Sequence, residues 1–246
     1  MTTIADIYET INEFAPFDTA QKWDNSGFLV GSPAASVTKA LVTLDITAEA
    51  IAAARQMGAE LIVSHHPVIF RPLSVLRAGE PVYELAASGL SAIAAHTNLD
   101  ICEGGVGSCL AKALQLNNVR DAEEPFLKIG DLPQAMTAEQ FAKHCATCLH
   151  TAVRVHKGTE PITTVAVGGG SCGEFAEAAK AAGAQVLVSG EIRHNHYIGE
   201  DLTLIEAGHY ATEQPVILPL CAYLQERHPE VEWQSFDIGE PYTTVI

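Results

Sequence analysis

One segment occurs twice in the chain, and this repeat limits the folds that the sequence can adopt. Placed without a gap at an offset of 125 residues, Val42–Ser64 lies over Val167–Ser189 with eight identities in 23 positions. Each copy has an alanine-rich stretch, typical of a helix, that leads into a valine-rich strand. Alanine-rich helices followed by such strands give some identities by chance, so the match alone leaves a coincidence open.

The residues after each copy favour a true duplication. The first copy runs into two histidines and later into a strand that ends in HTNLD, whereas the second runs into GE and later into a strand, LTLIEAG, followed by HYATE. Each half therefore closes on a histidine and a carboxylate four residues apart. We expect two related α/β units with mainly parallel sheets and right-handed crossovers, over residues 1–125 and 126–246, with the C-terminal segment free to pack back on the first.

Periodicity and turn residues predict the individual elements. Thr47 is expected to cap a helix that Gly58 ends, and TAEQ (137–140) predicts a capping box that opens another helix. Residues 15–31 are expected to form a loop. The other expected elements are a helix over 3–14 and strands over 39–45, 61–66, 91–100, 151–156, 162–167 and 202–208.

Composition defines the class of protein. A chain of 246 residues with 48% hydrophobic and 18% charged residues is typical of a globular protein with one large or two modest cores. The first residues do not show the pattern of a secretion signal, which is a basic segment followed by an apolar stretch, and no apolar run reaches membrane-spanning length. We therefore expect a soluble, cytoplasmic protein. Its six cysteines are expected to be reduced thiols. The net charge of −16 argues against binding to nucleic acid or anionic membranes and is compatible with holding cations.

The polar residues at the strand ends form a candidate metal-ligand set. In parallel sheets the ligand crevice lies beyond the carboxyl ends of the strands. Three imidazoles and two carboxylates suit zinc, iron, manganese or nickel. Because five ligands exceed the need of one tetrahedral ion, two metals that share a carboxylate would use them all. The set comprises His65, His66, Asp100, His209 and Glu213.

The adjacent histidines fit this hypothesis only at a strand end. Successive strand side chains point to opposite faces, but a turn before Pro67 allows His65 and His66 to converge. A single histidine at such a position is more often a hydrogen-bonded structural residue than a ligand. Spacing alone also does not bring the two halves together, so a structural role remains the alternative.

Other motifs favour structural interpretations. Cys145 and Cys148, flanked by His144 and His150, resemble half a zinc site, but the segment has the pattern of an amphipathic helix. The glycine-rich GGGSCGE (168–174) can offer amides to a phosphate, yet it lacks a P-loop lysine, and a tight turn is favoured.

Two further groups stay open. Trp23, Asp24 and Asn25 are expected to shape a loop near the site through packing and side-chain hydrogen bonds. Arg193 can neutralise a substrate phosphate or pair with a neighbouring acid.

Five motifs in order along the chain resemble one known family. They are WDNSGFLVG (23–31), VSHHP (63–67), AAHTNLD (94–100), SGEIRHNH (189–196) and GHYATE (208–213). Together they resemble the Nif-three-like dinuclear metal centre hexameric proteins, which include proteins named GTP cyclohydrolase I type 2 homologues. The resemblance runs from the first loop to near the C-terminus, and the length matches the short form of the family. In SGEIRHNH, Asn195 separates His194 from His196, whereas related members often have the two histidines adjacent.

The resemblance implies a fold, an assembly and a site. It implies a two-domain α/β protomer in a toroidal homohexamer, with two divalent ions per chain between the units. Carried over residue by residue, the five residues of the candidate set fall on the family's metal ligands, and His96 falls on a site histidine near the ions.

The resemblance also implies a reaction class. A metal-bridging hydroxide would hydrolyse a small molecule such as a nucleotide, with GTP ring opening as one form, and His96 and Glu213 would be the catalytic residues. The alternatives are a noncatalytic metal-binding or partner-binding assembly and a nucleotide phosphoesterase.

Overall fold

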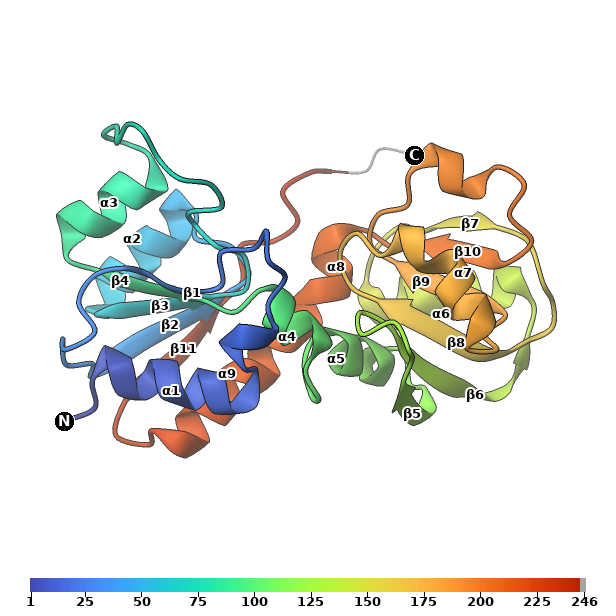
Figure 1. The fold of residues 1–246 in the computed structure, drawn as a ribbon, viewed down its shortest axis with the longest axis horizontal. Helices are drawn as coiled ribbons and strands as arrows, with labels where there is room; N and C mark the ends of the chain where they lie inside the picture. The colour runs from blue at the N-terminus through green and yellow to red at the C-terminus, as the bar shows by residue number, and fades with distance from the viewer. Residues whose placement is uncertain (244–246) are drawn as a thin grey trace. The chain divides into compact units, whose positions relative to one another are not determined.

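Residues 1–243 are described by the computed structural model, whose contacts divide the chain into two units. Among the described residues, the first comprises 1–103 with 217–241, and the second comprises 104–216 with 242–243. Each has its own sheet with helices on both faces, which confirms the predicted mixed α/β class (Figure 1). The division falls earlier than the expected 125/126 boundary because the helix over 106–113 packs into the second core, whereas the C-terminal strand joins the first sheet.

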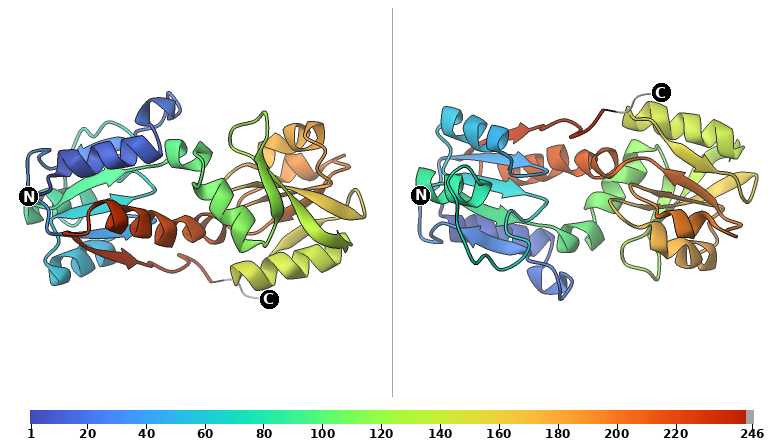
Figure 2. Two further views of the ribbon diagram at one scale, coloured as in Figure 1. Left: turned by 90° about the horizontal axis from the view of Figure 1, so that it is seen from below. Right: turned by 90° about the horizontal axis from the view of Figure 1, so that it is seen from above.

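The first unit has a sheet in the order β1-β4-β3-β2-β11, parallel except at the edge strand β1. Helices α2 and α3 cover one face, and α1 and α9 lie side by side on the other (Figures 1 and 2). The elements are α1 (Ile4–Phe14), η1 (Phe17–Thr19), β1 (Gly27–Val30), β2 (Lys39–Thr43), α2 (Ala48–Met57), β3 (Leu61–Ser64), α3 (Pro81–Ser88), β4 (Ser91–Ala94), α4 (Thr97–Ile101), α9 (Ile217–Arg227) and β11 (Glu232–Phe236).

The second unit has a sheet in the order β5-β6-β8-β9-β10-β7, parallel through β8, β9 and β10 and antiparallel outside them. The elements are α5 (Val106–Ala113), β5 (Asn117–Asp121), β6 (Lys128–Met136), α6 (Ala138–Leu149), β7 (Arg154–His156), β8 (Ile162–Gly168), η2 (Gly173–Phe175), α7 (Ala176–Ala181), β9 (Val186–Ser189), η3 (His194–Tyr197), β10 (Thr203–Glu206), α8 (His209–Glu213) and η4 (Gln214–Val216).

Strand alternation builds a core on each face of the second sheet. Val165, Val186 and Ile205 pack in one buried cluster with Phe141 of α6, while residues one position away pack in another with α7. Strand side chains alternate between faces, so parallel strands buried on both sides are continuously apolar. This explains the valine-rich runs in the sequence and fixes where each strand ends.

The repeat has a matching topology in both units. In the first, β4-β3-β2 are parallel neighbours, and in the second β10-β9-β8 take the same order. An antiparallel strand, β1 or β7, precedes each set in sequence and pairs with its last strand. The predicted equivalence of the two halves is therefore confirmed at the level of strand order.

Several local predictions are confirmed by the backbone. The Thr47 side chain accepts a hydrogen bond from the Ala50 amide, and Gly58 ends α2 in the left-handed conformation at φ +73°. Thr137 and Gln140 form the predicted capping box of α6. The predicted loop over 15–31 is wrong at its end, because Gly27–Val30 form the edge strand β1. Within residues 1–243, no helix has the length and apolarity needed to span a membrane.

Candidate metal site

His65 and His66 follow β3 directly, and their side chains lie close together. The strand ends at Ser64, and the two ring centroids are 4.8 Å apart. His65 is fully buried, with Nδ1 2.9 Å from the carbonyl oxygen of Ala95. The Nδ1 atom of His66 lies 2.8 Å from Oδ1 of Asp45. The end of the strand therefore brings the neighbouring imidazoles together, as the sequence predicted.

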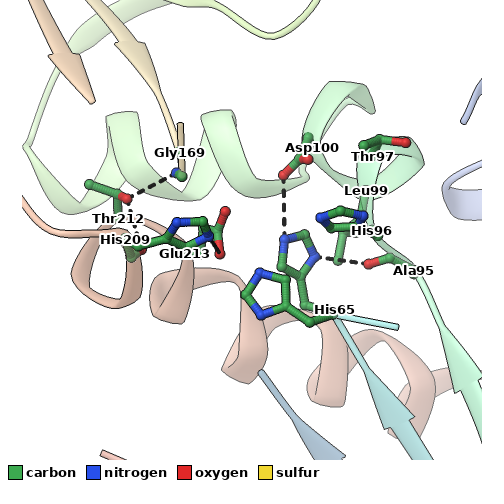
Figure 3. A network of polar contacts seen from close by, with 12 residues as sticks. His65, Ala95, His96, Thr97, Leu99, Asp100, Gly169, His209, Thr212 and Glu213 are labelled. Carbon is green, nitrogen blue, oxygen red and sulfur yellow. Dashed lines mark hydrogen bonds and ion pairs between the residues drawn. The ribbon is translucent and has the colours of Figure 1, made fainter. Parts of the chain in front are cut away.

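These hydrogen bonds determine which ring nitrogen of His65 can bind a metal. A carbonyl oxygen only accepts hydrogen bonds, so Nδ1 of His65 must donate its proton to Ala95 (Figure 3). In the neutral ring the lone pair then lies on Nε2. The Asp45 carboxylate selects the same tautomer for His66, in the manner of carboxylate–histidine pairs behind metal ligands. Both histidines are thus oriented for coordination through Nε2.

His96 joins the same cluster from the end of β4. Its Nδ1 lies 2.8 Å from Oδ1 of Asp24, so its Nε2 is also the available acceptor. The rings of His65, His66 and His96 each offer a nitrogen, and these nitrogens lie within 4.8 Å of one another. Three imidazole donors at this spacing can hold a divalent ion.

Asp24 is the buried anchor of this cluster. Its carboxylate accepts hydrogen bonds from the hydroxyls of Ser26 at 2.7 Å and Thr97 at 2.6 Å, besides the bond from His96. Burial opposes ionisation, but these hydrogen bonds outweigh it and hold the pKa of Asp24 well below its ordinary value. An ionised Asp24 therefore holds the His96 ring in place.

Asp100 completes the first unit's donor set. It lies on α4, and its Oδ1 is 3.5 Å from Nε2 of His65 (Figure 3). The carboxylate thus faces Nε2, the nitrogen that carries the lone pair in the neutral His65 ring. His96, four residues earlier, pairs with Asp24 instead of with Asp100.

In the second unit, His209 and Glu213 are paired across one turn of α8. Nε2 of His209 lies 3.0 Å from Oε2 of Glu213, as expected for residues four apart on a helix. Nδ1 of His209 lies 3.1 Å from Oε1 of Glu191, which follows β9. The Ser171 hydroxyl donates to Glu191 at 2.6 Å, and this bond, together with the charge of His209, lowers the Glu191 pKa. His209 is therefore oriented by a carboxylate in the same way as His66.

A glycine-rich loop leaves room for this pair. Gly170 has φ +59°, and a Cβ atom there would lie 2.2 Å from Oε1 of Glu213 and 3.3 Å from Nε2 of His209. The backbone amide of Gly170 also donates to the Thr212 hydroxyl at 3.1 Å. The GGGSCGE segment therefore acts as the favoured tight turn, and it closes over the two donors.

Substituting Gly170 with alanine is expected to weaken divalent metal binding by about tenfold or more. Loss of a residue that only orients a metal ligand lowers the metal affinity by about that factor, and displacing the ligand itself should lower it at least as much. The carboxylate of Glu213 would have to move, and a left-handed alanine is strained by about 1 kcal/mol. Metal titration with a chromophoric chelator measures the affinity. Gly183→Ala, at φ +83° with no atom near its Cβ, is the control for backbone strain alone. Equal affinities in the two variants would contradict the steric role.

The structure also contains residues that the predicted ligand set lacked. Asp45, Glu191 and Asp24 each hold the Nδ1 atom of a site histidine. Asp45 follows β2 and Glu191 follows β9, so the strand-end rule that identified the histidines applies to them as well. Spacing did not reveal them because orientation of a ring depends on contacts between distant segments.

Other candidates lie outside the donor clusters. Among residues 1–243, neither the His194 nor the His196 ring makes a hydrogen bond or ion pair, and His196 lines a small pocket with Arg193 and Glu174. Cys145 is buried in α6, which confirms the predicted helix, and burial raises its thiol pKa. In the described part of the chain, neither Cys145 nor Cys148 belongs to a group of ligand atoms close enough to share an ion.

Comparison with known proteins agrees with the fold and the motifs. The family model Duf34/NIF3 (NGG1p interacting factor 3) matches residues 2–240. A protein of Streptomyces coelicolor named GTP cyclohydrolase 1 type 2 homolog is 31% identical over 100% of this chain and 95% of its own length. A Clostridium perfringens protein of the same name is 29% identical over 90% and 91%.

A solved structure shows the same fold. A Bacillus cereus protein described as related to NIF3 superimposes with a TM-score of 0.91 at 21% identity, covering 100% of this chain and 99% of its own. The family match spans nearly the whole chain and includes both sets of donors described above. The chain therefore belongs to the Duf34/NIF3 family.

Proposed function

We propose that this protein is a metal-dependent hydrolase that binds two divalent ions. The proposed ligands are His65, His66, Asp100, His209 and Glu213. The observation that carries the proposal is the orientation of the histidines: Nδ1 of each is engaged by an oxygen acceptor, and Nε2 of His65 and of His209 faces a proposed carboxylate ligand, Asp100 and Glu213 respectively. Purely structural histidines need no such uniform arrangement, whereas metal ligands commonly have it.

The donor set fits borderline divalent metals. Imidazole and carboxylate suit zinc, iron, manganese and nickel, and thiolates are absent from the clusters in the described residues. Two such ions would lower the pKa of a water molecule and stabilise negative charge on the attacked group. This chemistry suits hydrolysis of a phosphoester, an amide or a purine ring.

The chain's own residues have separate roles in this proposal. Asp24 fixes the tautomer of His96 so that Nε2 can accept a proton near the site. Glu191 and Asp45 orient His209 and His66, and they act as positioning residues. Glu213, buried beside Gly170, is proposed as a carboxylate that would hold the metal.

The substrate class follows from the relatives' names and stays part of the proposal. Relatives named GTP cyclohydrolase 1 type 2 homolog suggest a nucleotide, and ring opening of GTP is the proposed form of the reaction. The homohexamer, which the family resemblance implies, remains a proposal. The cytoplasmic location, which the sequence predicts, also remains a proposal. Light scattering of the purified protein tests the hexamer.

The test is a turnover assay with nucleotides in manganese, zinc or iron. Formate and phosphate release are measured separately, because formate reports ring opening and phosphate reports phosphoesterase activity. Glu213→Gln should abolish either product while the fold is retained, as checked by circular dichroism. Metal binding without turnover in the wild type would favour the noncatalytic assembly instead, and full turnover in Glu213→Gln would remove Glu213 from the proposed reaction.

A further inference from the structure

We infer that Trp23 and Phe70, with the adjacent Lys22 and Arg71, form a recognition surface for a planar aromatic ring that carries phosphate. As a surface for the substrate, it rests on the proposed hydrolase function. As a binding surface, it can be tested without any turnover. All four residues lie in the first unit, on the segment before β1 and on the segment after β3.

The aromatic part lies directly beside the histidine cluster. The rings of Trp23 and Phe70 are 5.9 Å apart and tilted by 49°, and the His96 ring lies 6.2 Å from Trp23 and 6.1 Å from Phe70. Trp23 is 60% exposed and Phe70 is 44% exposed, although both are large apolar side chains. Exposed aromatic rings next to a catalytic histidine present faces on which a base can stack.

Hydrogen bonds hold the two segments of the chain that carry this surface. The Asn25 side chain donates to the backbone oxygen of Ile69 at 2.5 Å, which ties the residues beside Trp23 to those beside Phe70. Between Trp23 and Asn25, the Asp24 carboxylate, which has no exposed surface, is fixed by its bonds to Ser26, Thr97 and His96. The two rings are therefore positioned before any ligand binds, which reduces the entropy cost of binding.

Two cations are sequence neighbours of the aromatic residues and are available to an anion. Lys22 precedes Trp23 and Arg71 follows Phe70, and both are exposed. Within residues 1–243, neither side chain makes a hydrogen bond or an ion pair. In a chain with 30 acidic and 14 basic residues, two unpaired cations beside one pair of aromatic rings are unexpected. An Arg guanidinium binds phosphate oxygens in a bidentate manner, which makes Arg71 the main phosphate contact.

Together these groups select a ligand that has both an aromatic ring and a phosphate. An uncharged ring would not use the cations, and a simple phosphate would not use the rings. A long nucleic acid would meet the repulsion of the net charge of −16, whereas a single nucleotide meets far less. A nucleotide is the ligand that uses every group of the surface.

The experiment separates the ring from the phosphate. Isothermal titration calorimetry is run with GTP, guanosine and inorganic triphosphate on metal-loaded and on chelated protein. Trp23→Ala should weaken GTP and guanosine by at least roughly fivefold and leave triphosphate unchanged. Arg71→Ala should weaken GTP and triphosphate and leave guanosine unchanged. Tyr83→Ala and Arg55→Ala, an exposed aromatic and an exposed cation elsewhere in the same unit, should bind as the wild type does.

Several outcomes would overturn the inference, and one would overturn only the proposed hydrolase. Guanosine binding that is equal in wild type and Trp23→Ala excludes the ring contact, and so does a wild type that binds none of the probes. A change in mass by light scattering in Trp23→Ala, with GTP binding unchanged, would assign the surface to contacts between copies of the chain. Nucleotide binding by protein that takes up no metal when metal is supplied would contradict the proposed hydrolase and leave this surface intact. Metal uptake without nucleotide binding would do the reverse.

Discussion

Replacing His65 with alanine is expected to reduce the affinity for divalent ions by at least roughly 100-fold. Loss of a residue that only orients a metal ligand lowers the affinity by up to about that factor, and loss of the ligand itself should lower it at least as much. The reason is geometric: Nδ1 is fixed on Ala95, so Nε2 faces Asp100 at 3.5 Å and has no other orientation. The loss is measured by competition with a chromophoric chelator. His228→Ala is the matched control, because that histidine lies in the same unit and hydrogen-bonds Thr10 instead.

Folding must be checked in the same variant, because the His65 side chain is fully buried. Thermal unfolding followed by circular dichroism should show that the variant is folded at the temperature of the titration. His65→Gln is a second variant of more similar size. An unchanged metal affinity in either folded variant would remove His65 from the ligand set.

The second large effect is expected at Asp24. Asp24→Ala should lower the free energy of unfolding by about 3 kcal/mol, because removing a buried acceptor leaves its donors unsatisfied. The affected donors are Ser26, Thr97 and His96, and the Asp24 carboxylate has no exposed surface. Urea unfolding at pH 7 measures the change. Asp18→Asn is the control, since Asp18 is exposed and should change stability by no more than about 0.5 kcal/mol.

The Asp24 effect should depend on pH in a defined direction. The folded-state pKa lies below the ordinary value of 3.8, so the ionised carboxylate stabilises the fold above that pH. As the pH falls below about 4, protons bind the unfolded chain first, and the stabilisation is progressively lost. The difference between wild type and Asp24→Asn should therefore shrink in acid. A difference that stays constant from pH 7 to pH 3 would contradict an ionised Asp24.

The parallel cores of both sheets were predictable from the sequence, and so was the edge strand β7, whereas the other strands around the cores were not. Continuous apolar runs and the repeat indicated β2, β3, β8 and β9, because strands buried on both faces have that pattern. The edge strand β5 is exposed along its length, so its sequence, NNVRD, carries no apolar signal. The pairing of β11 with β2 joins distant segments and is not encoded in any local pattern.

The candidate site shows the same limit. The strand-end rule identified the histidines, but the equal four-residue spacing of His96 with Asp100 and of His209 with Glu213 did not reveal how these side chains pair. Only His209 pairs with its own helix neighbour, whereas His96 pairs with Asp24 from a distant segment. The residues WDN were predicted to shape a loop, and their contacts confirm it, with Asp24 buried and Asn25 bound to Ile69. Side-chain orientation needs the tertiary fold, which spacing does not supply.

The most direct test of the proposed metal centre is the number of divalent ions bound per chain in metal-replete, desalted wild-type protein, measured by inductively coupled plasma mass spectrometry. The proposal predicts close to two ions per chain, drawn from zinc, iron, manganese or nickel. Protein that retains no divalent ion after desalting, although it is folded, would contradict it.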